Sequence, residues 1–218
     1  MAVEVAISCG VPAGFHPLAL DPAQLPEAVA ELLAGLPPAP EGRATEVLAD
    51  YRQALGLLRE QDVLFCALGL HQGRDADVHS SVLALTAEPL SGAVPGLVLA
   101  DLLARATADA STAGVQPLEL PSGPGLLVEQ LCERTAPRFD GAGPQDWPVV
   151  PVWTGTVALA SAAQDRLALL QLSSAATALA AEYREVLLGT AHTLAFPAPA
   201  EPAAVPRPPR SRIADALS

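Results

Sequence analysis

The stretch from Val150 to Phe196 decides the fold and reads VPVWTGTVALASAAQDRLALLQLSSAATALAAEYREVLLGTAHTLAF. Two apolar runs, 149–160 and 166–173, are separated by the short turn Ala-Ala-Gln-Asp, which predicts an antiparallel hairpin. A helix is expected next, because apolar residues then recur at helical spacing. They are Leu179, Tyr183, Val186, Leu187, Ala191 and Leu194. The stretch therefore combines two neighbouring strands with a helix that packs on them.

Upstream of this stretch, strand patterns again follow one another. Strands are expected at 115–120 and 126–134. Residues 63–70 are continuously apolar, as in a strand that is covered on both faces. The polar loop 71–77 joins this strand to another at 78–87, so these segments predict a second hairpin. An additional strand-like run opens the chain at 3–8.

Three further amphipathic segments predict helices. The first two carry the apolar faces Leu25, Val29, Leu32, Leu33, Leu36 and Val47, Tyr51, Leu55, Leu58. The third begins at Pro95 and is expected to end at Gly114, with a buried stripe of Val98, Leu99, Leu102, Leu103, Ala106 and Ala110. Strands mostly follow strands, so we predict an α+β fold and not a doubly wound nucleotide-binding fold. The sheet should be mostly antiparallel, with about five to six strands and helices packed on it.

Composition predicts a single α+β domain over residues 1–196 and a Pro/Ala-rich disordered tail over residues 197–218. The chain has 218 residues, of which 50% are hydrophobic, enough to build a sizeable core. The tail, PAPAEPAAVPRPPRSRIADALS, has few residues that a core would bury. Its prolines favour extended backbone, so we expect it to stay unfolded.

The charge balance excludes two classes of partner. All 12 basic residues are arginines, and they face 24 acidic residues, which leaves a net charge of −12. Such a chain is not expected to bind the phosphates of nucleic acid or an anionic membrane through charge. We therefore expect a protein partner, while the oligomeric state is left open.

The N-terminus and the cysteines indicate a cytoplasmic protein. The first ten residues carry Glu4 and no basic residue, which is not typical of a signal peptide. Ser8-Cys9 resembles a lipoprotein cleavage site, but the basic start and long apolar run of such a signal are missing. No run approaches the ~18 apolar residues of a membrane-spanning helix. The three cysteines are odd in number and far apart, as in a protein with reduced thiols.

Three segments resemble an uncharacterised family of small actinobacterial proteins. The first is the quoted Val150–Phe196 stretch, with its Val-Pro-Val strand, Arg-Leu-Ala strand and Tyr-Arg-Glu helix. The others are PSGPGLLVEQ at 121–130 and DVLFCA at 62–67. The chain departs from the family at Ser174-Ala175, where relatives carry Thr-Pro, and it lacks the export signal of the lipoprotein members.

This resemblance implies the PsbP-like fold, an antiparallel sheet backed by helices. The same architecture occurs in an extrinsic protein of the oxygen-evolving complex and in a nuclear-import factor that binds the GTPase Ran. Relatives accompany type VII secretion components, so the resemblance implies a non-enzymatic protein-binding or accessory module linked to that pathway. The family has no established catalytic residues or cofactor, and none is transferred to this chain.

The alternative function is metal or small-molecule binding at the hairpin turn. His71, Asp75, Asp77 and His79 surround this turn, and imidazole and carboxylate groups bind divalent ions. The spacing is loose, however, and turns favour Asp for backbone reasons. Cys66 also precedes His71, which suggests a Cys–His–Asp nucleophile, but its apolar neighbours favour a buried structural cysteine.

Other catalytic patterns are weak. The chain lacks Gly-x-Ser-x-Gly, and without lysine it has no P-loop. Glu129 and Glu133 share one strand face, and Glu182 and Glu185 share one helix side; solvated polar faces explain both pairs. We predict no catalytic residues, no metal ligands and no cofactor as the leading interpretation.

Aromatic and arginine residues are the candidate partner-binding groups. Trp147 and Trp153 lie close together in a chain with only 4% aromatic residues, so they stand out. At least one of them should anchor the core, while Trp147 with Phe139 is expected to form a binding patch. In the tail, Arg207 and Arg210 flank a proline-rich segment that resembles a polyproline ligand. The predicted partner-binding set is Trp147, Phe139, Trp153, Arg207 and Arg210.

Overall fold

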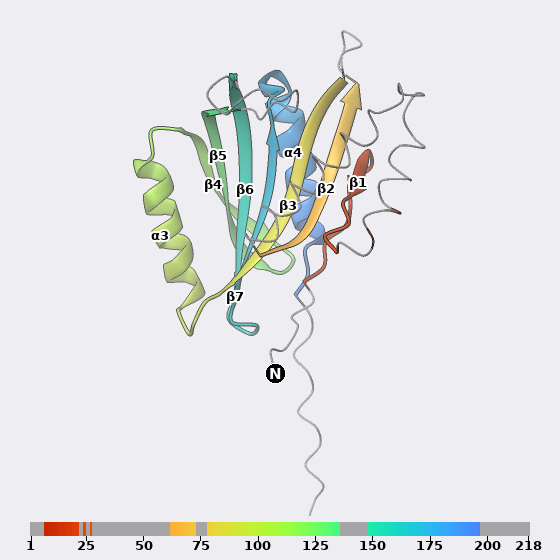
Figure 1. The fold of residues 1–218 in the computed structure, drawn as a ribbon. Coiled ribbons are helices and arrows are strands. Elements are labelled where there is room, and N and C mark those ends of the chain that lie inside the picture. The colour runs from red at the N-terminus through yellow and green to blue at the C-terminus, as the bar shows by residue number, and fades with distance from the viewer. Residues whose placement is uncertain are drawn as a thin grey trace, which may run out of the picture.

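The computed structural model describes residues 7–21, 24, 27, 62–72, 78–135 and 148–196, and in them the chain forms an antiparallel sheet with two α-helices (Figure 1). The elements are β1 (Phe15–Pro17), β2 (Val63–Gln72), β3 (Val78–Pro89), α3 (Pro95–Ala108), β4 (Thr112–Leu120), β5 (Gly123–Thr135), β6 (Val149–Ser161), β7 (Arg166–Ser174), the 3-10 turn η2 (Thr177–Leu179) and α4 (Ala180–Thr193). The seven strands follow the order β1-β2-β3-β7-β6-β5-β4. Every neighbouring pair is antiparallel, which confirms the predicted α+β class.

The sheet has seven strands, more than the five to six that the sequence predicted. The short edge strand β1 was not expected, because three residues show no alternating pattern. It pairs with β2 through Phe15 and Gly69, and the Phe15 side chain is 6% exposed. The expected opening strand lies mostly outside the described residues, although Ser8 forms an isolated bridge with Ala195.

Both predicted hairpins, β2–β3 and β6–β7, are confirmed. The third helix begins at Pro95 as predicted but ends at Ala108, well before Gly114. It ends at Asp109, because the backbone becomes extended there (φ −82°, ψ 122°), although the Asp109 amide still donates to the carbonyls of Arg105 and Ala106. Gly114 instead lies in β4, beside a register shift. The prediction that Gly114 ends the helix was therefore wrong.

The two helices cover opposite faces of the sheet, and each buries an apolar cluster (Figure 1). The larger core lies under α4, where Leu83, Leu127, Val157, Leu170 and Leu187 are fully buried. The smaller core lies under α3, where it consists of Leu90, Leu126, Ala158, Ala160 and Leu167. The described residues therefore form three layers, with the sheet between α3 and α4.

The close approach of α4 to the sheet depends on Gly155 in β6. A Cβ atom at this position would lie 2.7 Å from Leu187 Cδ2 and 2.7 Å from Trp153 Cη2. Both of these side chains are buried and belong to the larger core. Any side chain at Gly155 would therefore force α4 or the indole ring to move.

We predict that Gly155→Ala lowers the free energy of unfolding by about 1–3 kcal/mol, because the added methyl group overfills the core. Chemical denaturation measures the change. Gly189→Ala is the matched control, since a Cβ on this exposed helical glycine meets no atom within 4 Å. The control should gain up to about 1 kcal/mol from helix propensity. Equal stability of the two variants would contradict the predicted role of Gly155.

Several predicted features fall outside the described residues. These are the two expected helices within 25–58, most of the first strand, and the tail 197–218. In the part of the chain that the structure describes, no helix is both long and apolar enough to cross a membrane.

Candidate functional site

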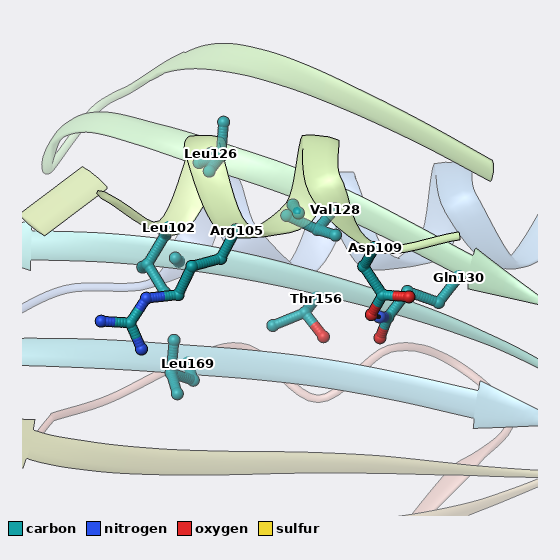
Figure 2. Close-up of a pocket in the computed structure, with 10 residues that line it drawn as sticks. Leu102, Arg105, Asp109, Leu126, Val128, Gln130, Thr156 and Leu169 are labelled. Carbon is teal, nitrogen blue, oxygen red and sulfur yellow. Dashed lines mark hydrogen bonds between the residues drawn. The ribbon is translucent and has the colours of Figure 1, made fainter. Parts of the chain in front are cut away.

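A groove of about 270 Å³ lies between the C-terminal half of α3 and the sheet (Figure 2). Its floor consists of apolar side chains from three adjacent strands. They are Leu126 and Val128 of β5, Ala158 of β6 and Leu169 of β7. Leu102 and Ala106 of α3 form the wall. The site is thus an apolar slot between a helix and a three-stranded floor.

Small side chains leave this space open. Along α3, the side chains that meet the sheet change from Val98, Leu99 and Leu102 to Ala106 in the last turn. The floor also carries an alanine, Ala158 of β6. The methyl groups of Ala106 and Ala158 fill less of the space beside the helix end than two leucine side chains would.

Polar groups mark one end of the groove. The Asp109 Oδ1 atom accepts hydrogen bonds from the backbone N–H and the hydroxyl of Ser111, both at 2.8 Å. Gln130 Nε2 donates to Asp109 Oδ2 at 3.1 Å. The bonds from Ser111, followed by the one from Gln130, lower the pKa of the Asp109 carboxyl, so it carries its charge at neutral pH.

The opposite end carries Arg105, whose side chain extends along the slot towards Leu169 (Figure 2). Arg105 Nη2 lies 2.6 Å from Asp101 Oδ2, one helical turn away. Both side chains are more than half exposed, so this ion pair adds little to stability. Thr156 lies between the two ends, with its hydroxyl group towards Gln130 (Figure 2).

Comparison with known families and curated proteins found no match. The resemblance to the actinobacterial family therefore stays a prediction.

Four of the five predicted partner-binding residues, Trp147, Phe139, Arg207 and Arg210, lie outside the described residues. The fifth, Trp153, is only 4% exposed and belongs to the larger core. Its ring stacks on Tyr183 of α4, with 6.2 Å between ring centroids. Trp153 is therefore the tryptophan that anchors the core, and its indole has no surface to offer a partner.

The hairpin histidines are cross-strand neighbours, because His71 of β2 pairs with His79 of β3. His71 Nε2 lies 3.0 Å from the hydroxyl oxygen of Ser81, a side chain that is 1% exposed. The His71 ring lies between Phe15 and Tyr183, at centroid distances of 5.2 and 5.6 Å. This packing gives His71 a structural role, as a link between the sheet edge, the hairpin and α4.

The proposed metal set is incomplete in the described part of the chain. Asp75 and Asp77 lie outside it. Among the residues that the structure does describe, no group of three or more His, Cys, Asp or Glu side chains is arranged to hold a metal ion. Metal binding at this hairpin stays a prediction.

We predict that stability falls as the pH drops through the titration range of His71. Burial lowers the pKa of His71 from its ordinary value of 6.5, and the facing His79 lowers it further. The unfolded chain therefore binds a proton more readily, so the contribution of His71 is complete above about pH 6.5 and is lost below it. As the pH is lowered from about 7.5 to 5, the melting temperature of His71→Gln should fall less steeply than that of the parent protein. An identical slope would contradict this prediction.

Cys66 is a buried structural cysteine, as its apolar neighbours predicted. Its side chain is fully buried, and burial raises the pKa of the thiol to about 11. A thiol with this pKa has almost no thiolate at neutral pH, so it is unsuited to nucleophilic catalysis. The burial and the raised pKa of Cys66 therefore give no support to a Cys66–His71–Asp75 nucleophile.

We predict that the Cys66 thiol resists alkylation in the folded protein. A chain carrying Cys9→Ser and Cys132→Ser should react with iodoacetamide about a hundred-fold more slowly when native than when unfolded, because thiolate is scarce and burial blocks access. Mass spectrometry measures the rate. The matched variant keeps the partly exposed Cys132 as the single thiol and should react faster in its native state. Rapid native labelling of Cys66 would contradict the prediction.

One of the paired glutamates has a partner that the sequence did not reveal. Arg184 Nε of α4 lies 3.2 Å from Glu129 Oε2 of β5. Arg184 also donates a hydrogen bond to the Gln116 side chain of β4. Glu133, Glu182 and Glu185 are exposed, as a solvated face predicts. Glu129 therefore helps to attach α4 to the sheet.

The groove itself was not predicted from the sequence. Its helical wall belongs to the predicted apolar stripe that runs from Val98 to Ala110, and this stripe was expected to be buried throughout. The replacement of large residues by alanine in the last turn was the available signal. Whether an alanine in the helix leaves a groove depends on which strand residues pack against it. The helical spacing of α3 does not contain that information.

Proposed function

We propose that this protein is a non-enzymatic, cytoplasmic accessory module that binds a protein partner through the groove beside α3. The observation that supports the proposal is an apolar slot with polar groups at both ends, built on regular secondary structure. Its volume of about 270 Å³ lies just below the usual range for small-molecule pockets, about 300–1,000 Å³. The slot is suited to one or two apolar side chains of a partner.

The helix beside the groove also exposes apolar side chains. Leu97 and Leu103 of α3 are 69% and 38% exposed, although neither of them lines the groove. The nearest sheet edge is less suited to binding, because β4 carries Pro117 in the middle of its length. Proline lacks a backbone N–H and so disfavours the addition of a further strand. These features favour docking on the helix-covered face over strand addition at this edge.

The resemblance to the actinobacterial family suggests which partner to test first. Because those relatives accompany type VII secretion, a component of that pathway is the first candidate for the occupant of the groove. The role proposed for this chain is to hold such a component as an accessory protein, without chemical change to it.

We predict that Ala106→Leu abolishes capture of the partner while the fold is retained. The larger side chain fills the slot, so the melting temperature should stay equal or rise. Loss of an anchor site costs at least about 2 kcal/mol, which weakens binding about thirty-fold. Affinity capture from a lysate of the encoding organism, followed by titration with the purified partner, measures this effect.

Ala104→Leu is the matched control, since Ala104 lies on the exposed side of the same helix. It should bind the partner as the parent protein does. Retained binding by Ala106→Leu would move the interface away from the groove. If the parent protein captures no specific protein at all, the binding-module proposal fails.

A further inference from the structure

The two ends of the groove carry opposite charges. The Arg105 guanidinium lies near Leu102 and Leu169, while the Asp109 carboxylate lies beside Gln130 at the other end (Figure 2). Apolar side chains form the floor between them. An occupant with an apolar centre and a charged group on each side would match this pattern, provided that its two charges are opposite.

The negative end is held in place more firmly than the positive end. Ser111 and Gln130 together give Asp109 three hydrogen bonds, and Gln130 Nε2 also lies 3.3 Å from Ser111 Oγ. Arg105 has Asp101 as its ion-pair partner, but its side chain is 75% exposed. A guanidinium has five N–H donors, so it can meet Asp101 and a second carboxylate together.

The groove also offers groups that suit a peptide backbone, at its acidic end and between the two ends. Gln130 uses its amide nitrogen for the contacts with Asp109 and Ser111, which leaves its carbonyl oxygen as an acceptor. The nearby Thr156 hydroxyl can donate. One peptide unit supplies the matching N–H and C=O groups.

The placement of the two charges also fits an extended peptide. Arg105 and Asp109 are four residues apart along the helix, a rise of about 6 Å. The Arg105 side chain extends away from Asp109 along the slot, so the two charged groups lie further apart than this rise (Figure 2). In an extended chain, residues i−2, i and i+2 point to the same face, and the outer two are about 13 Å apart. Charged residues two positions before and after a buried side chain therefore face the two ends of the groove.

We propose that the occupant of the groove is an extended peptide segment in which an acidic and a basic residue stand two positions before and after an aliphatic residue, in either order. The aliphatic side chain fills the slot, the acidic residue meets Arg105, and the basic residue meets Asp109. This inference rests on the proposed function, because it names the chemistry of the partner at the same groove.

The test uses short capped peptides and the full-length ¹⁵N-labelled protein. The probes have the cores Glu-Ala-Leu-Ala-Arg and Arg-Ala-Leu-Ala-Glu, which cover both chain directions. Glu-Ala-Leu-Ala-Glu, Arg-Ala-Leu-Ala-Arg and Glu-Ala-Ser-Ala-Arg are the comparison peptides. NMR titration to millimolar peptide should shift the amide signals of Ala106, Val128 and Gln130. The better mixed-charge peptide should bind about three-fold more tightly than either like-charged peptide, as expected for exposed charge pairs. The serine peptide should bind about ten-fold more weakly, because it lacks the apolar anchor.

Charge reversal gives the sharper test. In Arg105→Glu the groove has acidic groups at both ends, so the preferred peptide should change to Arg-Ala-Leu-Ala-Arg. Arg134→Glu, on an exposed residue near the end of β5, is the matched control and should keep the preference for mixed charge. The net charge of −12 by itself favours Arg-Ala-Leu-Ala-Arg in every variant. A preference for that peptide in the parent protein would therefore overturn the proposal.

Two other outcomes also overturn it. One is equal binding of all five peptides, and the other is a set of shifts that lies away from the groove. The peptides can fail to bind while Ala106→Leu still weakens binding of the captured partner. In that case the occupant of the groove has a different chemistry, and the proposed function stands. If Ala106→Leu leaves partner capture unchanged but blocks the peptides, the groove binds peptides and the partner docks elsewhere.

Discussion

The contact between Leu187 of α4 and Gly155 of β6 determines how closely the main helix approaches the sheet. β6 lies inside the sheet, paired with β5 on one side and β7 on the other. Because Gly155 has no side chain, Leu187 and Trp153 both fit against the strand and close the larger core. Tyr183, one turn earlier on α4, then packs on Trp153 and His71. The edge strand and the β2–β3 hairpin are thereby linked to the same helix.

The opposite face of the sheet is covered less completely, and this difference produces the candidate site. α3 contributes large side chains in its first turns but only Ala106 near its end. Asp109 ends the helix and is held by Ser111 and Gln130, so the end of α3 is attached to β5. The groove therefore exists before any partner arrives. A preformed site of this kind loses little conformational entropy on binding.

Local sequence patterns predicted the elements well where one pattern dominates. The hairpin β6–β7 and the helix α4 were placed within about a residue, because alternation and helical spacing change clearly between them. The end of α3 was missed, since the backbone becomes extended at Asp109, whose carboxylate accepts a bond from Ser111, before Gly114 is reached. The strand β2 was expected to be covered on both faces, yet Leu64 is 49% exposed while Cys66 and Ala67 are fully buried. Burial depends on which neighbours lie above each position.

The sequence by itself determined the α+β class, the antiparallel hairpins, the acidic charge and the inert character of Cys66. These properties follow from residue type and from spacing along the chain, both of which are local. Only the tertiary structure decided that Trp153 is a core residue, that Arg184 meets Glu129, and that Arg105 and Asp109 border one groove. Each of these depends on residues far apart in the chain that meet only through strand order and helix packing. Spacing along the chain carries no information about such contacts.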